Sequence, residues 1–298
     1  MKKFVLLGSP AAHSFSPAIQ NAAFNEAGFD WRYEAVEVTP EELAATIVSM
    51  RKHGWLGANV TIPYKETVLP LLDEIAPSAV QTSAVNTIVN KSGHLVGHNT
   101  DLRGFIRDLR THWQVPRTGR SLILGAGGAA RAVAFGLAQE GLDLSLIARS
   151  VRRAEQLAED VRRNHELEVA ALPWARESFV KTASQCTLIV NATPLGMMPD
   201  IQISPWPGDV PFPAAAFVYD LIYSPKETQL VQQAQRSGLR AASGAGMLLE
   251  QAAHSYELWT GLRAPRERMR DALEDALVRA SAWGRTEDQP DRREVLDA

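Results

Sequence analysis

The sequence contains one cysteine, Cys186, among its 298 residues. A single cysteine cannot form an intrachain disulfide or a cysteine-based zinc site, so we expect a reducing, cytoplasmic setting and no metal centre. No apolar run reaches the roughly 18 residues that a membrane span needs. The apolar run at residues 4–7 is too short for the core of a signal peptide and is expected to be a buried first strand.

An excess of positive charge is also lacking. The chain has 31 Lys and Arg against 34 Asp and Glu, a net charge of −3, which gives no electrostatic basis for binding nucleic acid. Its composition, 45% hydrophobic and 22% charged, is that of a globular protein long enough for two domains. We therefore expect a small-molecule substrate, with no nucleic acid or membrane partner. The residues do not specify an oligomeric state, and a homodimer stays open.

The most informative stretch is the glycine-rich segment at residues 125–130. Residues 121–124 suit a buried strand, an apolar-periodic helix follows the glycines, and residues 144–148 suit a second strand. This order is the first half of a dinucleotide-binding βαβ unit. Gly125 would permit the tight turn, and Gly127 would let the backbone approach a pyrophosphate. The free N–H groups that open the helix would then face an anion.

The end of the second expected strand indicates which dinucleotide binds. An NAD-binding unit usually has an acidic residue there, which accepts from the ribose 2′-hydroxyl. This chain has Arg149 and Ser150 instead, followed by Arg152 and Arg153. A guanidinium binds a phosphate in bidentate fashion but cannot accept from a hydroxyl. The residues thus favour NADP(H), although Arg152 and Arg153 are equally compatible with a solvated helix start.

Lys65 and Asp101 are candidates for proton transfer. Pro63 predicts the first turn of a helix, which would place Lys65 near the positive end of a helix dipole. A lone lysine is usually a solvated surface group, so it requires a partner. Asp101 is either a helix N-cap or a carboxylate that orients the amine. Asn86 lies in the strand expected at residues 84–89, where asparagine is uncommon.

Two further positions carry polar side chains of interest. Ser16 precedes Pro17 and suits the N-cap of a helix. Ser14 has no such role, and two hydroxyls beside a helix N-terminus also form a binding corner for a carboxylate. Gln251 lies on the mostly apolar face of the long helix expected between Ser243 and Gly261, where it is either a chance occurrence or functional.

Together these segments resemble the shikimate dehydrogenase family. The resemblance covers about residues 4 to 282, and the same motifs occur in the same order, which is far more specific than any one of them. The motifs are Gly8-Ser-Pro10, Ser14-Phe-Ser16-Pro17, Asn59-Val-Thr61 with Lys65, Ala84-Val-Asn86-Thr87, Asn99-Thr-Asp101, Gly125-Ala-Gly-Gly-Ala129, Arg149-Ser-Val-Arg-Arg153, Asn191-Ala-Thr-Pro-Leu-Gly196, Tyr219-Asp220 with Tyr223, and Gly246-Met-Leu with Gln251.

The resemblance implies two α/β domains, an N-terminal substrate-binding domain and a C-terminal NADP-binding Rossmann domain, with the active cleft between them. The substrate domain would comprise residues 1–102 plus 245–284, the Rossmann domain residues 103–244, and a flexible tail residues 285–298. The implied reaction is the reversible, NADPH-dependent reduction of 3-dehydroshikimate to shikimate, an oxidoreductase step in the biosynthesis of chorismate and the aromatic amino acids.

The resemblance also implies roles for individual residues. Lys65 would be the general acid, paired with Asp101. The substrate carboxylate would be held by Ser14, Ser16 and Tyr223, and the ring hydroxyls by Asn59, Thr61, Lys65, Asn86, Asp101 and Gln251. The cofactor would be bound by Gly125, Ala126, Gly127, Gly128, Ala129, Arg149, Ser150 and Arg153, with Leu221, Gly244 and Met247 beside the nicotinamide.

Some residues depart from the family pattern. These are Leu102 in place of a usual glycine, Thr82-Ser83 in place of Ile-Gly, Phe15 between the two serines, and Ala148 where asparagine is common. None removes a proton-transfer or hydroxyl-binding group, but they leave open a quinate/shikimate dehydrogenase of broader substrate range. An alternative of another class is a non-catalytic module that senses a cofactor or metabolite. Lys65 and Asp101 argue against it, because a sensor needs no proton donor.

Overall fold

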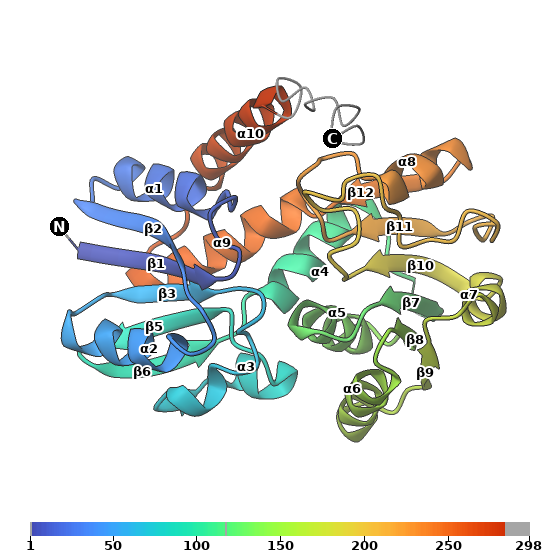
Figure 1. The fold of residues 1–298 in the computed structure, drawn as a ribbon, viewed down its shortest axis with the longest axis horizontal. Coiled ribbons are helices and arrows are strands. Elements are labelled where there is room, and N and C mark those ends of the chain that lie inside the picture. The colour runs from blue at the N-terminus through green and yellow to red at the C-terminus, as the bar shows by residue number, and fades with distance from the viewer. Residues whose placement is uncertain (1, 117, 284–298) are drawn as a thin grey trace, which may run out of the picture.

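The computed structural model describes residues 2–116 and 118–283, so the tail predicted at residues 285–298 lies outside the described residues. Two six-stranded sheets lie side by side, each covered by helices (Figure 1). This arrangement confirms the prediction of two α/β units. No helix in the described part of the chain is long and apolar enough to cross a membrane.

The first sheet is mixed, with strand order β2-β1-β3-β5-β6-β4. Its strands β1, β2 and β3 are parallel, whereas β5 and β6 form an antiparallel hairpin. The strands are β1 (Lys2–Gly8), β2 (Trp31–Glu37), β3 (Gly57–Val60), β4 (Glu74–Ile75), β5 (Thr87–Lys91) and β6 (His94–His98). The helices in this part of the chain are α1 (Ser16–Glu26), α2 (Leu43–Lys52), the 3₁₀ helix η1 (Leu69–Leu71) and α3 (Pro77–Thr82).

The second sheet is parallel throughout, with strand order β12-β11-β10-β7-β8-β9. The chain runs outward from β7 to β9 on one side and from β10 to β12 on the other, so β7 and β10 meet at the topological switch point where ligands bind in such sheets. The strands are β7 (Arg120–Leu124), β8 (Asp143–Ala148), β9 (Val169–Pro173), β10 (Cys186–Asn191), β11 (Phe217–Asp220) and β12 (Arg240–Ser243). The helices are α5 (Gly128–Gln139), α6 (Val151–Asn164), α7 (Arg176–Ala183) and α8 (Gln229–Arg236).

Two helices connect the units, α4 (Asp101–His112) and α9 (Ala245–Thr260), and they pack on each other (Figure 1). Phe105 of α4 lies in the core of the second unit, edge-on to Tyr219. Met247 of α9 lies in that same core, whereas Tyr256 lies in the core of the first unit together with α10 (Arg266–Trp283). Because α9 contributes to both cores, the domain limits at residues 102 and 245 stay a prediction.

A buried arginine also joins the two units. Arg131 of α5 is 6% exposed, and its guanidinium donates to the backbone carbonyl of Thr82 at the end of α3. It also forms an ion pair with Asp160 of α6 at 2.6 Å. A buried guanidinium requires such partners, so this contact fixes α5, which begins at the glycine turn, against the first unit.

The prediction of a helix after Pro63 is wrong. Residues 61–68 form turns that lead into η1. The backbone carbonyl of Lys65 accepts from Val85 N–H at 2.7 Å, so it serves a neighbouring segment rather than a helix. Lys65 is therefore not placed at a helix dipole.

The structure also corrects three local predictions. Ser16 is the first residue of α1 rather than its N-cap, and its backbone N–H donates to Ser14 Oγ at 3.2 Å. Asp101 is likewise inside the first turn of α4, whose N-cap is Thr100. Asn86 lies directly before β5, not within the strand. Neither Ser16 nor Asp101 therefore has the N-cap role that competed with a functional one.

The crossing of α4 and α9 depends on Gly104. A Cβ atom there would lie 2.8 Å from Gln251 N and 2.9 Å from Gln251 Cβ. We expect Gly104→Ala to lower the free energy of unfolding by about 1–3 kcal/mol because of overpacking. Alanine in a helix interior normally stabilises by about 1 kcal/mol, so the sign is diagnostic. Urea unfolding measures it, with the exposed Gly208→Ala as control, because a Cβ at Gly208 meets open space. A stabilised Gly104→Ala protein would contradict the close crossing.

Candidate active site

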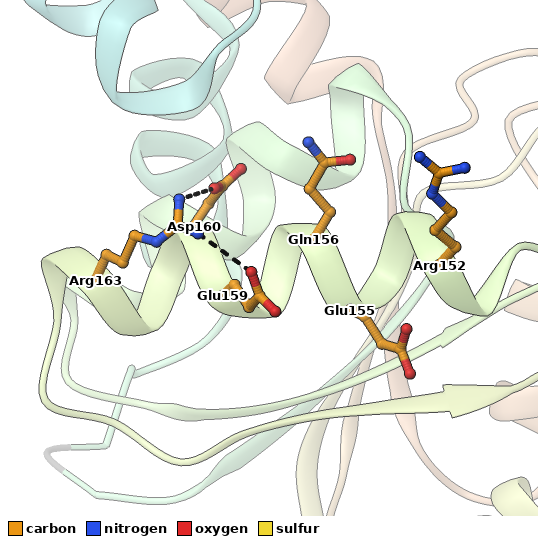
Figure 2. A pocket seen from close by; sticks show the side chains of 6 residues that line it. All are labelled: Arg152, Glu155, Gln156, Glu159, Asp160 and Arg163. Carbon is orange, nitrogen blue, oxygen red and sulfur yellow. Dashed lines mark hydrogen bonds and ion pairs between the residues drawn. The ribbon is translucent and has the colours of Figure 1, made fainter.

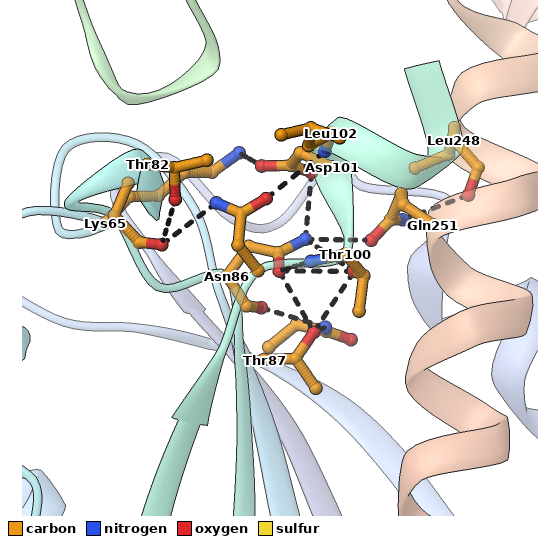
Figure 3. Close-up of polar contacts among 12 residues, drawn as sticks. Lys65, Thr82, Asn86, Thr87, Thr100, Asp101, Leu102, Leu248 and Gln251 are labelled. Atoms are coloured by element: carbon orange, nitrogen blue, oxygen red, sulfur yellow. Dashed lines mark hydrogen bonds and ion pairs between the residues drawn. The ribbon is translucent and has the colours of Figure 1, made fainter. Parts of the chain in front are cut away.

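The centre of the site is an ion pair between two segments that are distant in sequence. Lys65 Nζ lies 2.6 Å from Asp101 Oδ2, and the two side chains are only 14% and 6% exposed (Figure 3). Lys65 comes from the turns after β3, and Asp101 from the first turn of α4. The pair also borders the glycine turn, because a Cβ on Gly128 would lie 3.0 Å from Lys65 Cβ.

Asn86 holds the other oxygen of the carboxylate. Its Nδ2 donates to Asp101 Oδ1 at 2.8 Å and is also 3.3 Å from Gln251 Oε1 (Figure 3). Its Oδ1 accepts from Thr100 N–H at 2.7 Å. With both carboxylate oxygens engaged, Asp101 can present Lys65 Nζ in one orientation. The structure thus brings Lys65, Asp101, Asn86 and Gln251 together.

A second layer of polar side chains supports this group. Asn59 Nδ2 donates to Thr87 Oγ1 at 3.0 Å and to Ser255 Oγ at 3.1 Å. Asn59 Oδ1 accepts from Tyr33 Oη at 2.7 Å. Since the amide of Asn59 is used within this layer, its contact with a substrate hydroxyl stays a prediction.

Four residues of this layer were not predicted as site residues from the sequence, namely Tyr33, Thr87, Thr100 and Ser255. Three signals were available. Thr87 and Thr100 are the chain neighbours of Asn86 and Asp101, and Ser255 lies one helical turn after Gln251. Nothing in the sequence pattern marks Tyr33, which reaches the layer from β2.

The predicted carboxylate corner combines the two serines with two tyrosines. Ser14 Oγ donates to Ser16 Oγ at 3.1 Å. The hydroxyl of Tyr223 lies within hydrogen-bonding reach of Ser14, and that of Tyr33 within reach of Ser16. Burial raises the pKa of both phenols, so both stay protonated. Because Tyr33 Oη already donates to Asn59 Oδ1, Tyr223 is the phenol that can donate to an anion. Thr61, at the end of β3, packs its methyl group against Gly8.

The glycine turn has the geometry that a dinucleotide requires. Gly125 has φ +112°, a conformation that favours glycine, and a Cβ there would lie 3.0 Å from the carbonyl oxygen of Ala192. A Cβ on Gly127 would meet nothing within 4 Å, so the backbone is open to a ligand at that point. Helix α5 begins at Gly128. The backbone N–H groups of its first turn, including those of Gly128 and Ala129, point out of the helix N-terminus towards this opening. Ala126 packs against the core beneath. The residues therefore fit a pyrophosphate.

The predicted phosphate ligands differ in how far they are already engaged. Arg149 is exposed after β8, and its guanidinium has no hydrogen bond or ion pair with the described residues. Ser150 is the N-cap of α6 and accepts from Arg153 N–H at 3.4 Å. The Arg153 guanidinium pairs with Glu66 at 2.5 Å. Arg149 is thus the best placed of the three for a 2′-phosphate.

The residues expected beside the nicotinamide lie together. A Cβ on Gly244 would lie 2.1 Å from the carbonyl oxygen of Leu221, and Met247 packs in the same core as Leu221. A separate hollow lies on the surface of α6 (Figure 2). None of the predicted site residues lines it, although Arg153 belongs to the same helix. Its lining is Arg152, Glu155, Gln156, Glu159, Asp160 and Arg163.

Comparison with known proteins agrees with this geometry. Residues 6–88 match the family described as shikimate dehydrogenase substrate binding domain, and residues 244–274 match the shikimate 5′-dehydrogenase C-terminal domain. A protein of Symbiobacterium thermophilum named shikimate dehydrogenase (NADP(+)) is 45% identical, covering 91% of this chain and 93% of that relative. The chain belongs to the shikimate dehydrogenase family.

Solved structures of this family have the same fold. Shikimate 5-dehydrogenase from Thermus thermophilus, in complex with NADP(H) and shikimate, superposes with a TM-score of 0.82 at 37% identity and covers 93% of this chain and 100% of its own. Quinate dehydrogenase from Corynebacterium glutamicum, in complex with NAD, gives a TM-score of 0.82 at 29% identity, covering 92% and 99%.

The polar layer beneath the ion pair leads to a test with Thr100. Its Oγ1 accepts from Asn86 Nδ2 at 2.8 Å and lies 3.3 Å from Ser255 Oγ, in a fully buried position. We expect Thr100→Val to lower the free energy of unfolding by about 1–3 kcal/mol, because buried polar groups lose a partner without a change of shape. Chemical denaturation measures this, with the exposed Thr67→Val as control. Equal stability of the two variants would show that the layer is dispensable.

Proposed function

We propose that this chain catalyses the reversible reduction of 3-dehydroshikimate to shikimate with NADPH, as a step towards chorismate and the aromatic amino acids. The observation that carries the proposal is the buried Lys65–Asp101 pair beside the glycine turn, in a chain that belongs to the shikimate dehydrogenase family. The relatives named for NADP(+) and the exposed arginine after β8 support NADP(H) as the cofactor.

The roles of the central residues follow from their contacts. NADPH, when bound, supplies the hydride. Lys65 then donates a proton to the carbonyl oxygen of the substrate as that oxygen becomes a hydroxyl, and the neutral amine takes the proton back in the reverse direction. Asp101 holds Nζ at 2.6 Å, and Asn86 prevents the carboxylate from turning away. The low exposure of the pair keeps water from competing for the proton.

The remaining assignments are part of the same proposal. The corner of Ser14, Ser16 and Tyr223 binds the carboxylate of the substrate with neutral hydroxyl donors. The ring hydroxyls are bound by Asn59, Thr61, Asn86 and Gln251. The cofactor is bound by residues 125–129, Arg149, Ser150 and Arg153, with Leu221, Gly244 and Met247 at the nicotinamide. The substrate domain comprises residues 1–102 plus 245–284, and the Rossmann domain residues 103–244.

The cellular setting and the assembly of the protein are also part of the proposal. A single, buried cysteine suits a reducing, cytoplasmic environment. A homodimer is the assembly to test, and sedimentation velocity with the purified chain distinguishes it from a monomer.

A broader substrate range is the second candidate. The likeness to quinate dehydrogenase from Corynebacterium glutamicum favours it, as do the departures at Leu102 and Thr82. Initial rates with shikimate and quinate, each with NADP⁺ and NAD⁺, separate the two candidates. Turnover of quinate at a rate close to that of shikimate would establish the broader enzyme, and no turnover of either acid would refute both.

Lys65 provides the sharpest test of the chemistry. We expect Lys65→Ala to lower kcat by about 10²–10⁴-fold with little change in KM, the loss typical of a missing acid or base. Steady-state kinetics with shikimate and NADP⁺ measure this. Lys52→Ala, in the exposed end of α2, is the matched control. If Lys65→Ala retained activity within a few-fold of wild type, the lysine would be a bystander.

Arg149 tests the choice of cofactor. We expect Arg149→Ala to weaken NADPH binding by about 10- to 100-fold, because a phosphate loses a charge-assisted hydrogen-bond donor. Binding of NADH should change little, since it lacks the 2′-phosphate. Fluorescence titration of both dinucleotides measures the two constants, and Arg163→Ala at the far end of α6 serves as control. Equal weakening of NADPH and NADH would rule out the phosphate contact.

A further inference from the structure

Asp220, the last residue of β11, carries a carboxylate with no exposed surface. Its Oδ1 accepts from Asn191 Nδ2 at 2.9 Å and from Ile222 N–H at 3.1 Å, and its Oδ2 accepts from Thr228 Oγ1 at 2.6 Å. All three donors are neutral. Hydrogen bonds from neutral groups are therefore the contacts that stabilise the buried carboxylate. Burial raises its pKa to about 6.

One set of these contacts holds the loop after β10. Asn191 Oδ1 accepts from both the N–H and the hydroxyl of Thr193, at 3.0 and 2.7 Å. Thr193 Oγ1 accepts in turn from Leu195 N–H at 3.2 Å. The loop packs on the glycine turn, because a Cβ on Gly125 would lie 3.2 Å from Thr193 Cγ2. The carboxylate thus fixes the loop that supports the pyrophosphate turn.

The other contacts hold the segment after β11. Leu221 N–H donates to Asn191 O, and Gly244 N–H donates to Ile222 O, both at 3.0 Å. In the proposed function, Leu221 and Gly244 lie beside the nicotinamide. Tyr223, in the same segment as Leu221, binds the substrate carboxylate. Thr228 also caps α8 by accepting from Val231 N–H at 3.3 Å. Three segments at the carboxyl edge of the sheet therefore share one anchor.

The charge on this anchor lowers stability. A carboxyl whose pKa is higher in the folded than in the unfolded chain binds its proton more tightly when folded. Its contribution to stability is largest below the unfolded value and is lost as the pH rises through about 6. At neutral pH, a neutral amide of the same shape would be less costly to bury. A buried carboxylate that lowers the free energy of unfolding at neutral pH breaks a rule of stable packing, and such exceptions are expected at functional sites.

We propose that Asp220 is a positioning residue for the reaction, whose ionised carboxylate holds the loops at residues 191–195 and 221–223 in register with the glycine turn. The inference rests on the proposed function for the identity of the bound dinucleotide. It assigns Asp220 no contact with substrate or cofactor. Its effect is exerted through the backbone of Leu221 and Ile222 and through the side chain of Asn191.

Asp220→Asn separates positioning from simple stabilisation. The amide keeps the shape, but only one of its two terminal atoms can accept a hydrogen bond. On the Oδ1 side its NH₂ group would face the N–H donors of Asn191 and Ile222, and on the Oδ2 side the Thr228 hydroxyl would have to turn and accept. We expect the Kd of NADPH, measured by fluorescence at pH 7.5, to rise about tenfold, the effect of losing one hydrogen bond to a charged group. The Tm of the ligand-free variant should equal or exceed that of wild type. Asp209→Asn, an exposed residue of the same unit paired with Arg176, should change neither value.

A pH series gives an independent readout. In the wild type, the Kd of NADPH should rise as the pH falls from 7 to 5 and Asp220 takes up a proton. In Asp220→Asn, the part of this rise that is due to Asp220 should be absent. Tyr219 precedes Asp220 in β11, but burial raises the pKa of its phenol well above its ordinary value and so outside this range. Asp108, bonded to Tyr219 at 2.6 Å, also has a raised pKa. It is present in both proteins, so the difference between their profiles reports Asp220.

The outcomes are distinct. Weaker NADPH binding with an unchanged or raised Tm, and a flattened pH profile, would support the positioning role. Unchanged NADPH binding would overturn it, and so would a fall in Tm or a failure to fold, because either would make Asp220 a structural residue. If the wild type bound NADPH but did not turn over shikimate, the proposed function would fail while the binding and stability results still decided the role of Asp220.

Discussion

A lysine and an aspartate that water barely reaches lie 2.6 Å apart, and the surrounding structure is needed to keep them there. An ion pair removed from water gains little in net stability, yet loss of one partner is expensive. The pair persists because Asn86 engages the second carboxylate oxygen and because the layer of Thr87, Thr100 and Ser255 fixes that amide. Lys65 is thus held by a network that involves both β5 and α9.

Helix α9 explains how two units form one site. Met247 in its first turn packs in the second core, Gln251 reaches Asn86, and Tyr256 packs in the first core. A displacement of this helix would therefore disturb both units together. Its close approach to α4, which carries Asp101, makes the two helices a shared support for the Lys65–Asp101 pair.

Local features were predictable from the sequence, and remote partnerships were not. The strand–glycine turn–helix unit follows from the spacing of a few adjacent residues. The helix after Pro63 was wrong because the carbonyl of Lys65 bonds Val85, twenty residues on. Tyr33 was missed for the same reason, because its partner Asn59 is 26 residues away. Ser255 bonds the same Asn59 from 196 residues away, and only its spacing from Gln251 indicates it. The family resemblance supplied candidates that periodicity alone could not.

The contact between Gly128 and Lys65 has a consequence for how the glycine motif is interpreted. The motif is usually explained by the needs of the dinucleotide alone. Here the hydrogen in place of a methyl group at Gly128 also makes room for the lysine stem, whose Cβ lies 3.0 Å from where that methyl would be. Gly128 therefore meets a steric demand of Lys65 that is separate from any demand of a dinucleotide.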